Sequence, residues 1–128
     1  HTLMVIDEAR RRNADLDHND ATQREPGWSS LIDVPMHPEY PSGHSILAAT
    51  VARVVEADSG GAVLPTLATT SPTAKGATRR WTSADDFVRE VSDGRIWGGI
   101  HFRSATQAGE AMGQRIGELA ARQLSPAH

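Results

Sequence analysis

The pattern of apolar and polar residues predicts three long helices in this chain. Apolar residues recur at helical spacing over residues 45–57, and the sequence DSGG that follows is a helix stop. A second helix is expected after Thr82 or Ser83 as N-cap, with acidic residues in its first turn and Gly94 as its stop. A third helix is expected over about residues 106–124, so the chain is predominantly helical.

The segments outside these helices differ in composition. Residues 1–12 are expected to form a short amphipathic helix, and residues 13–44, which contain four prolines and several apolar anchors, a long ordered loop. Residues 58–80 are expected to form another loop, in which Val63-Leu64 and Thr78–Trp81 pair as a short hairpin. The expected fold class is therefore all-α, a helical bundle with long ordered loops.

The third predicted helix carries Gly109, Gly113 and Gly117 at four-residue spacing, which places them on one stripe. Glycine costs about 1 kcal/mol relative to alanine inside a helix, so a compensating contact is expected. We expect another helix to approach the backbone along this stripe, within a bundle or in a dimer. Dimerisation inside a membrane is excluded by the charged residues on the same helix.

Composition and charge narrow the classes of function. The 128 residues suffice for one small domain, and we expect residues 1–128 to form a single helical domain. The net charge of −3 and the scattered basic residues offer no face for nucleic acid, and no apolar stretch is long enough to span a bilayer. The absence of cysteine excludes disulfides and thiolate metal sites. With 38% hydrophobic residues the core is thin, so a covering partner is expected.

A dense polar cluster, HPEYPSGHS, lies directly before the first predicted helix. Pro41 fixes the approach of the chain, and Ser42 and Gly43 allow a tight turn into the helix. The free amides and the positive dipole end of a helix N-terminus favour an anion, and His44 lies within proton-transfer range of it. Because Gly43 has no side chain, an oxyanion can approach its amide. The alternative is an N-capping serine beside a surface histidine.

A second cluster, GRIWGGIHFR, comes before the third predicted helix. The planar donor fork of Arg95 suits a tetrahedral oxyanion. His101, six residues later, offers a ring nitrogen as nucleophile or as ligand to a central atom. The two clusters together predict an oxyanion pocket, provided that the fold brings His44 and His101 face to face. The alternative for the second cluster is a helix start with a satisfied histidine.

The motif PSGHS followed by R-x5-H resembles the second and third signatures of a superfamily. This superfamily unites type 2 phosphatidic acid phosphatases, bacterial acid phosphatases and vanadium-dependent haloperoxidases. The longer segments GWSSLIDVPMHPEYPSGHS and GRIWGGIHFRSATQAGEAMGQRIG are similar to its soluble haloperoxidase-like branch, and the resemblance covers about residues 11–122. It implies a helical bundle of the haloperoxidase and acid phosphatase type, of which this chain is expected to form the C-terminal half.

The resemblance also implies a role for each matching residue. His101 would bond the vanadium of vanadate, or attack phosphorus in a phosphatase, and Arg95 would donate to the equatorial oxygens. The Ser42 hydroxyl and the Gly43 amide would bind other oxygens, and His44 would be the acid–base group. The implied cofactor is vanadate, or phosphate as substrate or ligand, and the implied small-molecule partners are peroxide and a halide, or a phosphomonoester. A secreted or periplasmic location is implied as well.

The chain also departs from the family pattern. The first signature, a lysine followed by Arg-Pro, is absent. We therefore expect a fragment whose missing N-terminal helices carry that signature, or a truncated relative with weak or no activity. Gly94 replaces the usual serine, and Ala105 replaces the aspartate that orients the histidine in phosphatases, so His101 needs another group to set its tautomer. A homo-oligomer, or association with the missing N-terminal part, is expected to cover the apolar faces.

Three other functions compete with the haloperoxidase-like one. They are phosphomonoester hydrolysis through a phosphohistidine, a silent helical domain that acts in assembly, and a zinc site built from His37, His44 and His101. Outside a zinc site, His37 is expected to structure the loop near the mouth of the pocket. Trp28 and Trp97 are expected to be packing anchors.

Overall fold

The computed structural model describes residues 27–61 and 65–124, in which three helices and a short β-ribbon are formed. In chain order the elements are α2 (Gly43–Asp58), β1 (Leu67–Thr70), a 3₁₀ turn (Pro72–Ala74), β2 (Thr78–Trp81), α3 (Ala84–Trp97) and α4 (Arg103–Leu124). The expected helical bundle with long loops is confirmed. The helix expected over residues 1–12 lies outside the described residues. None of the helices within the described ranges has the length and apolar character needed to cross a membrane.

Ser42 caps α2, which begins two residues earlier than the apolar pattern suggested. Its backbone is extended, and its hydroxyl accepts a hydrogen bond of 3.4 Å from the Ser45 amide, as an N-cap serine does. Beyond the helix, Gly60 and Gly61 adopt φ angles of 69° and 73°, which glycine reaches without steric cost. The stop predicted from DSGG is thereby confirmed.

Ser83 is the N-cap of α3, since its hydroxyl accepts a hydrogen bond of 3.3 Å from the amide three residues on. The predicted stop at Gly94 is wrong, because the helix continues for one more turn and the Gly98 amide then donates to the Gly94 carbonyl at 2.9 Å. The carbonyl of Gly98 accepts from the Leu31 amide at 3.1 Å, so the preceding loop holds this last turn. As a result, Arg95 lies on a helix.

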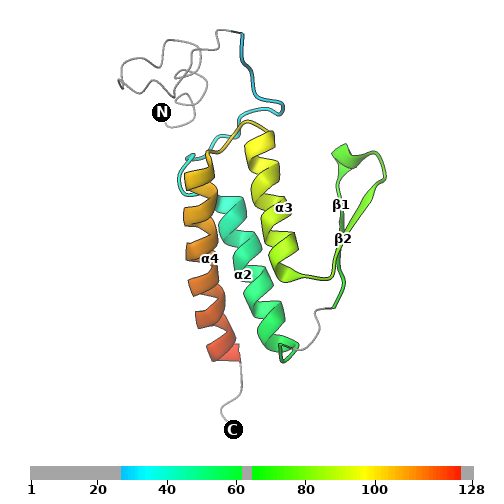
Figure 1. The fold of residues 1–128 in the computed structure, drawn as a ribbon, viewed down its shortest axis with the longest axis vertical. Helices are drawn as coiled ribbons and strands as arrows, with labels where there is room; N and C mark the ends of the chain where they lie inside the picture. Colours follow the sequence, from blue (N-terminus) through cyan, green and yellow to red (C-terminus); the bar gives the residue numbers. More distant parts are fainter. Residues whose placement is uncertain (1–26, 62–64, 125–128) are drawn as a thin grey trace.

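The three helices lie side by side, and α2 packs against both α3 and α4 (Figure 1). The chain runs down α2, returns along α3 and runs down α4, so the start of α2, the end of α3 and the start of α4 meet at one end of the bundle. The loop over residues 27–42 lies at this end. The buried apolar residues are few and mostly small, and they are Ala48, Ala49, Ala52, Trp81, Ala84, Ile100 and Ala105.

The glycine stripe of α4 lies against α2, as the spacing predicted. A Cβ atom at Gly109 would come within 2.6 Å of the Ser42 carbonyl oxygen, and Cβ atoms at Gly113 and Gly117 would also overlap α2. Across the same contact, the Thr50 hydroxyl donates to the Gly113 carbonyl at 3.1 Å. We call this contact between the two helices the α2–α4 seam. Its closeness explains why three helix-weakening glycines are kept on one face.

The strand predicted over Thr78–Trp81 is confirmed as β2, and β1 is its antiparallel partner. Val63 and Leu64, the partner expected from the sequence, lie outside the described residues. Trp81 Nε1 donates to the Glu90 carboxylate on α3 at 2.8 Å. This bond ties the ribbon to the bundle, so the fold is helical with one small β-element attached to α3.

Candidate functional site

The residues predicted to form the site lie together at the end of the bundle where the loop over residues 27–42 is found. Ser42 caps α2, and Gly43 and His44 lie in the first turn of that helix. Arg95 lies in the last turn of α3, and His101 lies between α3 and α4.

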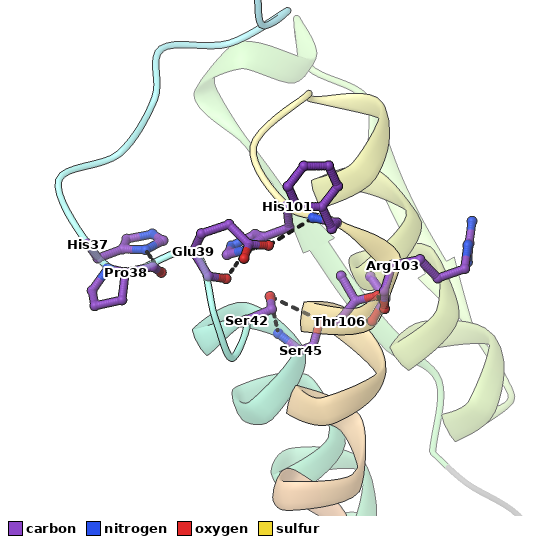
Figure 2. A network of polar contacts seen from close by, with 10 residues as sticks. His37, Pro38, Glu39, Ser42, Ser45, His101, Arg103 and Thr106 are labelled. Carbon is purple, nitrogen blue, oxygen red and sulfur yellow. Dashed lines mark hydrogen bonds and ion pairs between the residues drawn. The ribbon is translucent and has the colours of Figure 1, made fainter. Parts of the chain in front are cut away.

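His101 is buried, and only its Nδ1 atom has a partner within the described part of the chain. Nδ1 lies 2.6 Å from the Glu39 carbonyl oxygen (Figure 2). A carbonyl only accepts, so Nδ1 carries the proton and, in the neutral ring, Nε2 carries the lone pair. The Nε2 atom is buried without a hydrogen-bond partner. The lone pair of His101 Nε2 can therefore act as a nucleophile or bind a central atom.

Glu39 also holds the histidine segment with its side chain. Its carboxylate accepts the Phe102 amide at 2.9 Å and lies 3.6 Å from His101 Nδ1 (Figure 2). Together with its carbonyl, this carboxylate is the orienting group that the sequence left open when Ala105 replaced an aspartate. The sequence analysis did not predict this role for Glu39. The one sequence feature that could have indicated it is that Glu39 belongs to the same polar cluster, HPEYPSGHS, as Ser42.

The surroundings of His101 favour its neutral form. Burial lowers the pKa of His101 from its ordinary value of 6.5, and the positive charges of Arg95 and His37 act in the same direction. The hydrogen bond to the Glu39 carbonyl and the Glu39 carboxylate oppose this shift without reversing it. The lone pair on Nε2 is therefore available at neutral pH.

Arg95 presents two buried nitrogens, Nε and Nη2, that no group in residues 27–61 or 65–124 accepts from. Burial lowers the pKa of Arg95, but a guanidinium keeps its proton in proteins. By contrast, the neighbouring Arg103 pairs with Asp93 at 3.2 Å on the surface. Buried donors of a cation without an acceptor are destabilising, so an anion at this point would relieve a real cost.

A third imidazole, that of His37, lies close to both predicted histidines. Its ring centroid is 6.1 Å from that of His44 and 5.8 Å from that of His101, on which it stacks with an interplanar angle of 17°. His44 and Tyr40 line a hollow of about 450 Å³. His101 and Trp28 line another hollow, of about 420 Å³. The two predicted histidines thus lie at the same end of the bundle with His37 near both of them, but they line separate hollows and not the single pocket that the sequence predicted.

The pKa of His44 depends on the neighbouring arginine and histidine side chains as well as on burial. Burial is the largest cause of a lowered His44 pKa, followed by the charges of Arg95, His37 and His101. A positive charge on any of these three side chains disfavours protonation of His44, and an anion bound among them would have the opposite effect. The pKa values of His44 and His101 are therefore both lowered in the folded chain without a bound anion.

The first turn of α2 has room for an anion. Nothing lies within 4 Å of the position that a Cβ atom would take at Gly43. The first amides of a helix have no partner inside the helix and form its positive end. An oxyanion therefore has open space beside this amide, as the sequence predicted.

These residues fit a tetrahedral oxyanion such as vanadate or phosphate. Arg95 and the Gly43 amide supply donors for oxygens, and His101 Nε2 supplies a lone pair for the central atom. A zinc ion does not fit in the same way, because the described ranges contain no group of three or more His, Cys, Asp and Glu side chains that could hold a metal ion. The zinc alternative through three histidines has no support.

Known proteins share this architecture. A family described as the VCPO second helical-bundle domain matches residues 7–127. The crystal structure of the first bacterial vanadium-dependent iodoperoxidase is similar, with 27% identity and a TM-score of 0.64, over 77% of this chain and 24% of that chain.

Two crystal structures of a bacterial vanadium-dependent chloroperoxidase, holo-type and apo-type, are each 26% identical with a TM-score of 0.61. They match 75% and 74% of this chain, respectively, and 23% of the chloroperoxidase chain. The present chain therefore spans about a quarter of the length of these enzymes. No protein with curated function matches it.

Proposed function

The chain belongs to the vanadium haloperoxidase-like superfamily, in the family of the VCPO second helical-bundle domain, and from this premise we propose that it binds vanadate for peroxide-dependent halide oxidation. The observation that carries the proposal is the set of three buried polar atoms without partners among the described residues, Arg95 Nε, Arg95 Nη2 and His101 Nε2. Arg95 Nε and Nη2 would donate to the oxygens of vanadate, and His101 Nε2 would hold its central atom. Vanadate would supply the centre at which peroxide oxidises the halide.

The chain's own residues hold this group and handle protons. His101 offers its Nε2 lone pair while the Glu39 carbonyl keeps the proton on Nδ1. Arg95 donates to the oxygens from the side of α3. His44 takes up and releases a proton at its ring, because its lowered pKa keeps the neutral form available near neutral pH.

The start of α2 binds the remaining oxygens in this proposal. The Gly43 amide donates at the positive end of the helix, where negative charge is favoured. The Ser42 hydroxyl donates beside it. The helix thus contributes its dipole and two donors without a charged side chain.

Ligand entry requires a side chain to move, since the three unpartnered atoms are buried. His37 stacks on His101 and lies near His44. Its described hydrogen bond runs from Nδ1 to the adjacent Pro38 carbonyl at 3.0 Å and is local. We therefore assign the entry step to rotation of the His37 ring, which would join the hollows beside His44 and His101.

Phosphomonoester hydrolysis is the second candidate, and the position of Glu39 favours it. A phosphohistidine mechanism needs a neutral Nε2 nucleophile and a group that orients the opposite nitrogen. His101 and Glu39 form this pair here, although the aspartate of the phosphatases is replaced by Ala105.

Calorimetric titration with vanadate, combined with two assays, tests the proposal. We expect vanadate to bind and His101→Ala to weaken binding by about 100-fold or more, since even the indirect partners of a metal site are worth about 10–100-fold. Arg103→Ala is the matched control, because its guanidinium pairs with Asp93, and should bind like the unchanged chain.

The two assays separate the candidates. Vanadate-dependent bromination of a dye by bromide and peroxide supports the haloperoxidase, and hydrolysis of p-nitrophenyl phosphate without vanadate supports the phosphatase. If the chain binds neither vanadate nor phosphate, the proposed function is wrong and a silent domain that acts in assembly is left.

A further inference from the structure

Glu39 contacts the segment of His101 through both its backbone and its side chain. Its carbonyl oxygen lies 2.6 Å from His101 Nδ1, and its carboxylate accepts the Phe102 amide at 2.9 Å (Figure 2). The Glu39 side chain is only 13% exposed, although Pro38 and Tyr40 on either side are exposed residues. A carboxylate that is largely removed from water is costly unless it accepts hydrogen bonds. The carbonyl explains the tautomer of His101, but it does not explain what keeps a loop carbonyl in this place.

Two backbone bonds tie the loop to the helix ends on either side of Glu39. The Leu31 amide donates to the Gly98 carbonyl at 3.1 Å, and the Ser42 amide donates to the Ala105 carbonyl at 3.0 Å. Between these points, the described hydrogen bonds from the loop to the rest of the chain are the two made by Glu39. Of these two, the carboxylate bond is the one that joins the loop to the backbone beside the histidine ring.

We propose that Glu39 is a positioning residue, because the bond from the Phe102 amide to its carboxylate keeps its carbonyl on His101 Nδ1 and thereby the lone pair on Nε2. The consequence for binding rests on the proposed function, in which Nε2 holds the central atom of vanadate. The proton of a neutral imidazole stays on one nitrogen only while the acceptor beside that nitrogen stays in place. When the carbonyl moves away, the ring exchanges between two tautomers, and the one with a proton on Nε2 cannot hold vanadate.

Long-range proton–nitrogen NMR spectra of the full chain without ligand measure the tautomer directly. They are recorded at about pH 7.5, where the lowered pKa of His101 keeps its ring neutral. The signals of His101 are identified by their absence in His101→Ala. We expect the form with the proton on Nδ1 in the unchanged chain and a mixture of both tautomers in Glu39→Ala.

Two further variants separate the loss of the acceptor from other effects of the substitution. Glu39→Leu fills a similar volume without an acceptor and should give the same mixture, even if Glu39→Ala does not fold. Glu39→Gln is the matched control, because its amide oxygen still accepts the Phe102 amide, and it should retain the form with the proton on Nδ1. Since all three variants lack the carboxylate charge, binding is compared among them.

Calorimetric titration with vanadate and with inorganic phosphate connects the tautomer to binding. Relative to Glu39→Gln, the Kd for vanadate should rise about two- to tenfold in Glu39→Ala, by the reciprocal of the fraction of the competent tautomer that the spectra give. Inorganic phosphate accepts hydrogen bonds but forms no bond to Nε2 on binding, so its Kd should not rise. A carboxylate that merely braces the loop predicts an equal rise for both anions with the tautomer unchanged, and that result would overturn the inference.

Failure of the inference can be distinguished from failure of the proposed function. If Glu39→Ala and Glu39→Leu keep the proton of His101 on Nδ1, the inference is wrong, while vanadate binding by the unchanged chain leaves the proposed function standing. If the unchanged chain binds no vanadate, the proposed function is wrong, and the inference is overturned with it because Glu39 then positions no ligand atom.

Discussion

The α2–α4 seam and the site end of the bundle belong to the same three helices, but they differ in whether their buried polar groups have hydrogen-bond partners. Along the seam, backbones approach closely over glycine and alanine, and the Thr50 hydroxyl bonds across it to the Gly113 carbonyl. At the site end, Arg95 and His101 keep buried nitrogens without partners among the described residues. The close packing of the seam stabilises the fold, and the unpaired nitrogens destabilise it.

The seam also sets the geometry of the site. The Ser42 amide donates to the Ala105 carbonyl at 3.0 Å, and Gly109 packs against the Ser42 carbonyl. These contacts fix the start of α2 against the start of α4, which begins two residues after His101. A rigid, well-packed seam therefore allows the site to hold donors in a costly arrangement until an anion arrives. The comparison teaches that stability and binding reside in different parts of this small bundle.

The largest expected effect comes from removing the unpaired cation. Arg95→Met should weaken vanadate binding by more than 100-fold, because two charge-assisted hydrogen bonds are worth about 1.5–3 kcal/mol each. The same change should raise the free energy of unfolding by up to about 1 kcal/mol without ligand, since it removes buried donors that lack an acceptor. Chemical denaturation and vanadate titration measure the two effects. A variant that loses stability and keeps its affinity would contradict the comparison.

A smaller effect is expected at the seam, where two glycine-to-alanine changes should have opposite signs. Gly113→Ala places a methyl group against the α2 backbone and should cost about 1–3 kcal/mol of unfolding free energy. Gly94→Ala is its matched control on α3, where nothing lies within 4 Å of the added carbon, and should stabilise by up to about 1 kcal/mol. Equal effects of the two changes in urea denaturation would show that the seam is not tightly packed.

The smallest expected effect is a pH dependence of the free energy of unfolding, caused by histidines at the site end of the bundle. The pKa values of His44 and His101 are lowered in the folded chain from 6.5, so below this pH the unfolded chain binds protons that the folded chain does not. Stability should be unaffected by these groups above pH 6.5, fall as the pH drops from 6.5 through the lowered values, and level off below them. Denaturation curves recorded between about pH 7.5 and 5.5 measure this slope.

His44→Gln is the variant that tests the origin of the pH dependence. It removes one of the two shifted groups, so the fall in stability below pH 6.5 should be shallower than in the unchanged chain. Saturating phosphate should also flatten the slope, because a bound anion favours the protonated imidazoles. An identical slope in the variant would assign the pH dependence to other groups.

Local sequence signals were sufficient where the structure depends on neighbouring residues. Apolar periodicity and capping residues predicted all three described helices, and glycine spacing predicted the seam. The motifs around Ser42 and Arg95 predicted which side chains meet at one end of the bundle. In each case a residue's role follows from residues within about one helical turn of it, or from a family pattern that records the fold.

Features that depend on distant contacts could not be predicted in the same way. The predicted end of the helix at Gly94 is wrong because α3 has an extra turn. The amide of Leu31, which is far away in the sequence, holds this turn by donating to the Gly98 carbonyl. Glu39 was missed because its role exists only when the loop meets Phe102. The stacking of His37 on His101 likewise depends on how the loop folds back over the α3–α4 connection.

A crystal structure of the chain with vanadate tests the central claim most directly. The claim is that one oxyanion satisfies the buried nitrogens of Arg95 and His101. We predict vanadium bonded to His101 Nε2, with Arg95 Nε and Nη2 donating to its oxygens and the His37 ring displaced from its stack. Vanadate bound elsewhere, or His101 Nε2 and Arg95 unchanged at saturating vanadate, would contradict the account.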